Sequence, residues 1–164
     1  MELKWSDLVI DKRAVNASPA NLMAEWLWLV PAGSDPMLPT VCGDIFLHCP
    51  DGRVAFLDTY AGKCEIVASN YEVWKQMVTT GNHPDEWFKV GLVADLLAAG
   101  IKPSPGQCFS PLIPPFVNGT WKPTNFQACD LVVHLTVLGQ MLHSVQDLPP
   151  GTRISRFDVK SPHR

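Results

Sequence analysis

Three aspartates, Asp44, Asp51 and Asp58, surround the first predicted β-hairpin and are the side chains best placed for acid–base chemistry. Two carboxyl groups can serve as acid and base when their surroundings separate their pKa values. Aspartate is also favoured at turns and strand ends, because its side chain hydrogen-bonds the nearby backbone. We therefore interpret all three as turn and strand-end residues, and we predict no catalytic residue.

The adjacent pair His48 and Cys49, together with Cys42 or Cys64, carries the donor atoms that zinc prefers. Structural zinc sites, however, take their ligands from tight pairs separated by about two to four residues. These four residues do not follow that spacing. We interpret His48 as a core or sheet-face histidine, and we predict neither a metal nor a cofactor.

The elements that must position these side chains begin with three short runs of β-forming residues, 44–48, 53–59 and 63–68. Turn residues separate the runs, which predicts an antiparallel meander. A sheet this small needs helices on one face to be stable. We expect helices at 20–30 and 130–146 to provide that cover. The predicted fold class is therefore α+β, a small and mainly antiparallel β-meander sheet packed against several helices in a single domain.

The clearest helix follows Asp130, a residue type that is favoured at the N-cap. Its apolar residues recur at helical spacing and form one stripe, which we expect to be buried: Leu131, Leu135, Leu138, Leu142 and Val145. His134 and His143 lie nine positions apart on the same helix and point to different sides, which excludes a metal-binding pair. We expect both to be surface or edge histidines.

At 164 residues, 46% hydrophobic and 18% charged, the chain has the composition of one well-packed globular domain. Its start carries Glu2, Asp7 and Asp11, where an export signal needs a basic beginning and an apolar run. No apolar run approaches the ~20 residues of a membrane span. We therefore expect a cytoplasmic protein with no membrane partner.

Charge is unevenly distributed along the chain. Residues 1–152 hold nine Lys and Arg against fifteen Asp and Glu, a net charge of −6, whereas residues 153–164 hold four against one, a net charge of +3, and the sum is −3. Non-specific nucleic-acid binding needs clustered basic side chains, so the acidic body argues against a direct nucleic-acid partner and favours a basic one. A solvated acidic surface without a partner explains the same imbalance. We divide the chain into an α+β domain, 1–152, and a basic C-terminal tail, 153–164.

A series of sequence landmarks carries a family resemblance: GDIFL, DGRVAFLD and a glycine-turned third strand, followed by GQCF, IPP, NGTW, NF, DLVVHLTVLGQ and SVQDLPPGT. This order resembles the bacterial family named for the C-terminal domain of a type VI secretion DNase-immunity protein. The resemblance spans about residues 41–152. It implies a cytoplasmic, non-catalytic immunity module that binds a cognate toxin or effector protein, with a nuclease as a candidate toxin. No catalytic or binding residue of the family carries over.

The first functional hypothesis is therefore a toxin-binding immunity or interaction module. The alternative is a small-molecule-binding protein or enzyme with a pocket between the β-meander and the 106–129 loop, and a third is a housekeeping role without a toxin. For the first hypothesis we expect partner contacts on the 116–123 loop, at Phe116, Asn118 and Trp121. The competing interpretation is that Phe116 and Trp121 cover the edge of the core. The sequence leaves the oligomeric state open.

Overall fold

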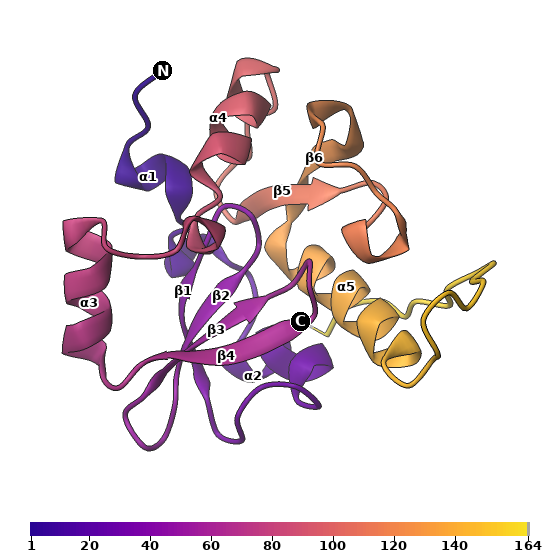
Figure 1. Cartoon of the computed structure of the whole chain (residues 1–164), viewed down its shortest axis with the longest axis horizontal. Coiled ribbons are helices and arrows are strands. Elements are labelled where there is room, and N and C mark those ends of the chain that lie inside the picture. The colour runs from indigo at the N-terminus through magenta and orange to yellow at the C-terminus, as the bar shows by residue number, and fades with distance from the viewer. Residues whose placement is uncertain (164) are drawn as a thin grey trace.

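The computed structural model describes residues 1–163 and contains a four-stranded and a two-stranded antiparallel sheet (Figure 1). The strands of the larger sheet are β1 Asp35–Pro39, β2 Ile45–His48, β3 Val54–Asp58 and β4 Lys63–Ala68, and those of the smaller sheet are β5 Gln107–Pro111 and β6 Phe126–Asp130. The α-helices are α1 Trp5–Leu8, α2 Pro19–Met23, α3 Tyr71–Thr80, α4 Val90–Ala98 and α5 Leu131–Val145. The predicted α+β class is confirmed.

The larger sheet is the predicted meander with one additional strand. Its order is β1-β2-β3-β4, and residues such as Phe46 and Phe56 lie directly opposite each other across the β2–β3 hairpin. The sequence did not indicate β1, because this strand contains Pro36 and Pro39 and proline cannot donate a ladder hydrogen bond. Both prolines are tolerated because β1 is an edge strand, and its pairing with β2 is irregular between Pro36 and Leu38.

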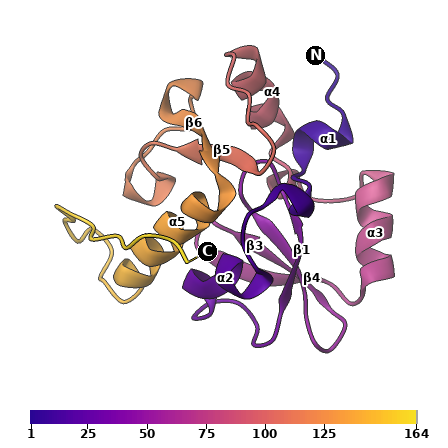
Figure 2. The ribbon, with the colours of Figure 1, turned by 180° about the vertical axis from the view of Figure 1, so that it is seen from behind.

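Both faces of the larger sheet are covered, because successive side chains of a strand point to opposite faces. In β2, Ile45 and Leu47 enter an aliphatic cluster shared with α2 and α5, whereas Phe46 enters an aromatic cluster with Trp74 and Trp87. Figures 1 and 2 show the sheet between α3 on one side and α2 with α5 on the other. A third cluster joins the smaller sheet to α4. The burial of both faces explains why β2 and β3 are almost continuously apolar.

Helix α5 supplies most of the cover on the aliphatic side. It begins after Asp130, whose carboxylate accepts hydrogen bonds from the Val132 and Val133 amides, as the N-cap prediction requires. The four leucines of the predicted stripe are buried and Val145 is partly buried. The expected helix at 20–30 is shorter than predicted: α2 ends at Met23 and continues as a 3₁₀ turn to Trp26. Trp26 is fully buried, and its indole Nε1 donates to the Leu135 carbonyl at 3.0 Å.

Leu138→Ala is expected to lower the free energy of unfolding by about 2–5 kcal/mol, because Leu138 is buried in the aliphatic cluster and its truncation leaves a void. His143→Ala on the exposed side of α5 is the matched control, since it removes only a stacking contact with Trp28. Urea unfolding followed by fluorescence measures both variants. Equal losses of stability would mean that the phase assigned to α5 is wrong.

Among residues 1–163, the structure has no helix that is both long enough and apolar enough to cross a membrane.

Candidate partner-binding site

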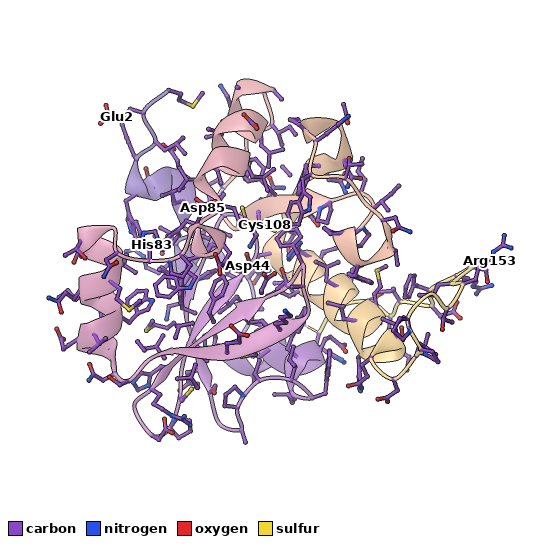
Figure 3. All side chains as sticks on the ribbon, in the orientation of Figure 1. Glu2, Asp44, His83, Asp85, Cys108 and Arg153 are labelled. Carbon is purple, nitrogen blue, oxygen red and sulfur yellow. The ribbon has the colours of Figure 1, made fainter. Side chains whose placement is uncertain are left out.

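A buried ion pair links the larger sheet to the segment before α4. Asp44 lies in the turn that precedes β2 and is fully buried, and Figure 3 shows it in the interior of the molecule. Its Oδ2 accepts a 2.5 Å hydrogen bond from Lys89 Nζ, and its Oδ1 accepts from the backbone amide of Thr59 at 2.8 Å and from the Thr59 hydroxyl at 3.0 Å. Asp44 therefore joins parts of the chain that are 45 residues apart.

The electrostatics of this pair follow from its burial. Burial raises the pKa of Asp44 to about 6, although the nearby Lys89 ammonium acts in the opposite direction. Burial alone would lower the pKa of Lys89, but the charges of Asp44 and Asp58 outweigh it and the pKa is raised. Lys89 Nζ also lies 5.1 Å from the ring centroid of Tyr60, in a cation–π position. The charge of Lys89 is therefore matched within the protein, and Lys89 is not a cation offered to a ligand.

Lys89 reaches Asp44 through an unusual backbone conformation. It is the N-cap of α4 and has φ 48° and ψ 46°, in the left-handed region that a residue with a Cβ seldom adopts. The 3₁₀ turn Asp85–Trp87 comes directly before it, and Lys89 Nζ also donates to the Glu86 carbonyl at 3.0 Å. The ion pair thus fixes the position of the Asp85–Lys89 segment on the sheet.

His134 continues the same polar network into α5. One ring nitrogen, Nε2, lies 3.0 Å from the Thr59 hydroxyl, and the other, Nδ1, lies 2.9 Å from the Ser110 hydroxyl of β5. Burial, and then the charge of Lys89, lower the pKa of His134 to about 3, so the ring is neutral. The expectation that His134 lies at the surface is wrong, because the side chain is 1% exposed. The network is closed to solvent at His134, so its contribution is to hold α5, β5 and the β3–β4 hairpin together.

The surface above this network is hollowed. A depression of about 460 Å³ is lined by Asp85, Glu86, Lys89, Leu92, Asp95 and Trp121. A second depression of about 210 Å³ is lined by Phe56, Asp58, Ala61, Lys63, Glu65, Val67, Glu86 and Trp87. Because Glu86 lines both, we treat them as one feature and call it the acidic groove. Five carboxylates face it against two lysines, and the charge of one of these, Lys89, is already matched by Asp44.

Trp121 forms one wall of the acidic groove. Its side chain is 48% exposed, and its ring lies 5.4 Å from that of Tyr60 and 6.3 Å from that of Phe126. Tyr60 is itself fixed, because its hydroxyl donates to the carbonyls of Cys42 and Phe109. One part of the Trp121 indole is therefore held by the core, and the rest is open to solvent.

The other two predicted contact residues lie in different surroundings. Phe116 is partly buried against the aliphatic cluster and meets Phe157 of the C-terminal tail edge to face, with ring centroids 6.5 Å apart. Asn118 is exposed and ends a 3₁₀ turn with φ 67°, a conformation that asparagine tolerates better than most residues. The structure thus brings Trp121 to the groove, whereas Phe116 packs on a different cluster.

Asn125 holds the 112–120 part of the loop in shape. Its side-chain amide donates to the carbonyls of Ile113 and Thr120 at 2.8 and 2.9 Å, and its Oδ1 accepts from the Ile113 amide at 3.0 Å. No sequence pattern indicates this role of Asn125. The groove carboxylates Asp85 and Glu86 are equally well explained as favourable charges near a helix start. Only the folded chain places them opposite Trp121.

Beneath the acidic groove, the contact between the meander and the 106–129 loop is filled by buried side chains. Cys42, Tyr60, Phe109 and Phe126 are buried there in one cluster. A hollow of about 510 Å³ lies beside the N-terminal segment, and its polar groups bond locally: Asp7 accepts from the Lys4 amide, and Gln107 accepts from the Ser104 amide. Across residues 1–163 no three His, Cys, Asp or Glu side chains gather as a metal-binding group. No convergent polar set favours the small-molecule alternative.

Comparison with known proteins finds a match to a family model. Residues 68–142 match the family model described as T6SS immunity protein Tdi1, C-terminal, where T6SS denotes the type VI secretion system. No curated protein matches the chain. The match confirms the type VI immunity resemblance, and it includes all six residues that line the first depression: Asp85, Glu86, Lys89, Leu92, Asp95 and Trp121.

Proposed function

We propose that this chain, which carries the Tdi1 C-terminal immunity pattern over residues 68–142, binds a cognate type VI secretion effector and neutralises it without catalysis. The single observation that carries the proposal is the family match. The geometry supports it, because the first depression of the acidic groove, with the half-exposed Trp121 and three carboxylates, lies within the matched segment. An inhibitor needs only a complementary surface, and the acidic groove is such a surface.

The chemistry of the groove favours a basic partner, and we propose that the effector is a nuclease. A nuclease must present Lys and Arg to the phosphates of its substrate. Carboxylates such as Asp85, Glu86 and Asp95 can pair with the same side chains and compete with the nucleic acid. A nuclease meets chromosomal DNA in the cytoplasm, so we propose that neutralisation takes place there.

Trp121 is the proposed anchor of this interface. Tryptophan is enriched among residues that dominate binding energy, because it buries a large and rigid surface. Trp121 is also preorganised by Tyr60, so little side-chain entropy is lost on binding. We propose Asn118, exposed on the same loop, as a contact at the rim, and Phe116 as a contact through the part of its ring that Phe157 leaves open.

Co-purification with the toxin-like product of a neighbouring gene tests the proposed function. The tagged chain is expected to retain that protein and to restore growth to cells that express it. For a nuclease effector, the purified chain should also stop degradation of plasmid DNA. A neighbouring toxin that is neither retained nor neutralised would overturn the proposal.

Trp121→Ala is expected to weaken effector binding by about 30-fold or more while leaving the thermal unfolding midpoint nearly unchanged. The matched control is Trp5→Ala, since Trp5 is also 48% exposed but contacts Phe88 edge to face and does not line the groove. Calorimetric titration and thermal unfolding measure the two effects. Unchanged binding by folded Trp121→Ala would remove the residue from the interface, and a large loss of stability would assign it to the core.

A further inference from the structure

The two edges of the larger sheet differ in how they are protected from further pairing. At the β1 edge, two prolines and an irregular register interrupt the ladder. The N-terminal segment also covers this edge: the Ile10 amide donates to the Pro39 carbonyl at 2.9 Å, and Val9 bridges Thr40. These are recognised ways of blocking an edge strand. The β1 edge is therefore closed to a partner strand.

Within residues 1–163 the β4 edge carries no proline and no covering segment, and the one irregularity of its pairing with β3 lies near its end, between Ile66 and Ala68. Its six residues pair only with β3, contain no proline and lie at the front of the sheet in Figure 1. Lys63, Glu65 and Ile66 are exposed and Cys64 is partly exposed. An exposed edge strand presents unpaired backbone donors and acceptors, which can extend the sheet into another chain. This edge is open to an additional strand.

The side chains of β4 identify the strand that fits it. Lys63 and Glu65 lie on one face of the sheet, and Cys64 and Ile66 lie on the other, because side chains alternate along a strand. In an antiparallel pair of β4 strands centred on Cys64, Lys63 of each copy lies opposite Glu65 of the other. Cys64 then faces Cys64, and Ile66 faces Gly62. One face gains two opposite-charge pairs and the other gains an apolar cluster.

We propose that two copies of this chain associate through β4, antiparallel about Cys64, to form one continuous eight-stranded sheet. Neighbouring registers are less favourable: centring on Glu65 places two carboxylates opposite each other, and centring on Lys63 places two ammonium groups together. Like charges directly opposite are destabilising in a sheet. A β1 strand then lies at each outer edge of the eight-stranded sheet. Because β1 is blocked, the assembly closes as a dimer and does not grow further.

Charge reversal provides the first test. Lys63→Glu or Glu65→Lys replaces two attractive pairs with two repulsive ones, and each is expected to raise the dimer dissociation constant about tenfold or more. The double variant Lys63→Glu/Glu65→Lys restores both pairs and should return the constant to within about threefold of the wild-type value. Sedimentation equilibrium measures all four proteins. Lys75→Glu on exposed α3 is the control for net charge, and it should leave the constant unchanged.

Circular dichroism checks that each variant is still folded. The check is needed because Lys63 also lies opposite Asp58 within the β3–β4 hairpin, so Lys63→Glu changes a contact inside the chain as well. Glu65 lies opposite the uncharged Phe56, so Glu65→Lys leaves the Lys63–Asp58 pair of the hairpin unaltered. A wild-type chain that stays monomeric at every concentration overturns the proposal. A dimer that is insensitive to both single reversals, or one that the double variant does not restore, also overturns it.

Cysteine cross-linking tests the register. Cys42, Cys49 and Cys108 are buried, so a short bis-maleimide reaches only Cys64 and Cys129 among the five thiols. A covalent dimer is expected from the wild type and from Cys129→Ser, and it should be lost in Cys64→Ser. The same dimer yield from Cys64→Ser would place the contact elsewhere. None of these experiments involves the effector, so their outcome is independent of the proposed immunity function.

Discussion

Asp44→Ala is expected to lower the free energy of unfolding by about 3–5 kcal/mol, because it leaves Lys89 buried without its counter-charge. The side chain of Lys89 is only 11% exposed and that of Asp44 is not exposed at all. The variant also removes the acceptor of the Thr59 amide, and a buried donor without a partner is itself costly. Urea unfolding near neutral pH measures the loss.

Two further variants show whether burial is the cause. Asp51→Ala breaks an ion pair with Arg53 in which both side chains are about half exposed, so it should cost much less stability than Asp44→Ala. The double variant Asp44→Ala/Lys89→Met removes both buried charges and should recover part of the loss. If Asp44→Ala costs no more than Asp51→Ala, the buried pair does not stabilise the fold as described.

The second large effect depends on pH and belongs to His134. Its pKa is about 3 in the folded protein, against an ordinary value of 6.5. Between these values the unfolded chain binds a proton that the folded protein excludes. The contribution of His134 to stability is therefore complete above about pH 6.5 and is lost as the pH falls, by about 1.4 kcal/mol per pH unit.

His134→Gln isolates this contribution by comparison with the wild type. The comparison is needed because Asp44 gives the stability a pH dependence of the opposite sign. Its pKa in the folded protein is about 6 and exceeds its ordinary value of 3.8, so its contribution to stability is lost as the pH rises through that range. The variant should be less stable than the wild type near neutral pH. The difference between their free energies of unfolding should shrink by about 2–3 kcal/mol on acidification to about pH 4.5. A gap that stays constant with pH would contradict a neutral, buried His134.

Local signals in the sequence predicted those parts of the fold that local physics determines. Asp130 caps α5 and Ser18 caps α2 as their residue types indicate, and the leucine stripe is buried. Helix α3 is capped in the same way by Asn70, whose side chain accepts a hydrogen bond from the Val73 amide. Strand β1 was missed because two prolines contradict strand propensity, and only the position of β1 at the sheet edge resolves that conflict.

The candidate site was less predictable, because it is made by contacts between distant parts of the chain. Asp44, Lys89 and His134 read as a turn residue, a surface cation and a helix-surface histidine, and nothing in their spacing indicates that they form one network. Trp121 was identified because it stood in a loop away from any apolar pattern. Its neighbour Tyr60 lies in the β3–β4 hairpin, so the wall of the groove could be found only from the folded chain.

The bounds of the family segment have a consequence for how such proteins can recombine. Residues 68–142 begin at the last residue of β4 and end inside α5, so the segment carries the first depression and Trp121 but leaves β1–β3 behind. A crossover between two genes at these bounds would transplant the first depression onto a foreign sheet. A recipient without a carboxylate where Asp44 meets the incoming Lys89 would leave that lysine buried without its counter-charge, and the hybrid would be less stable.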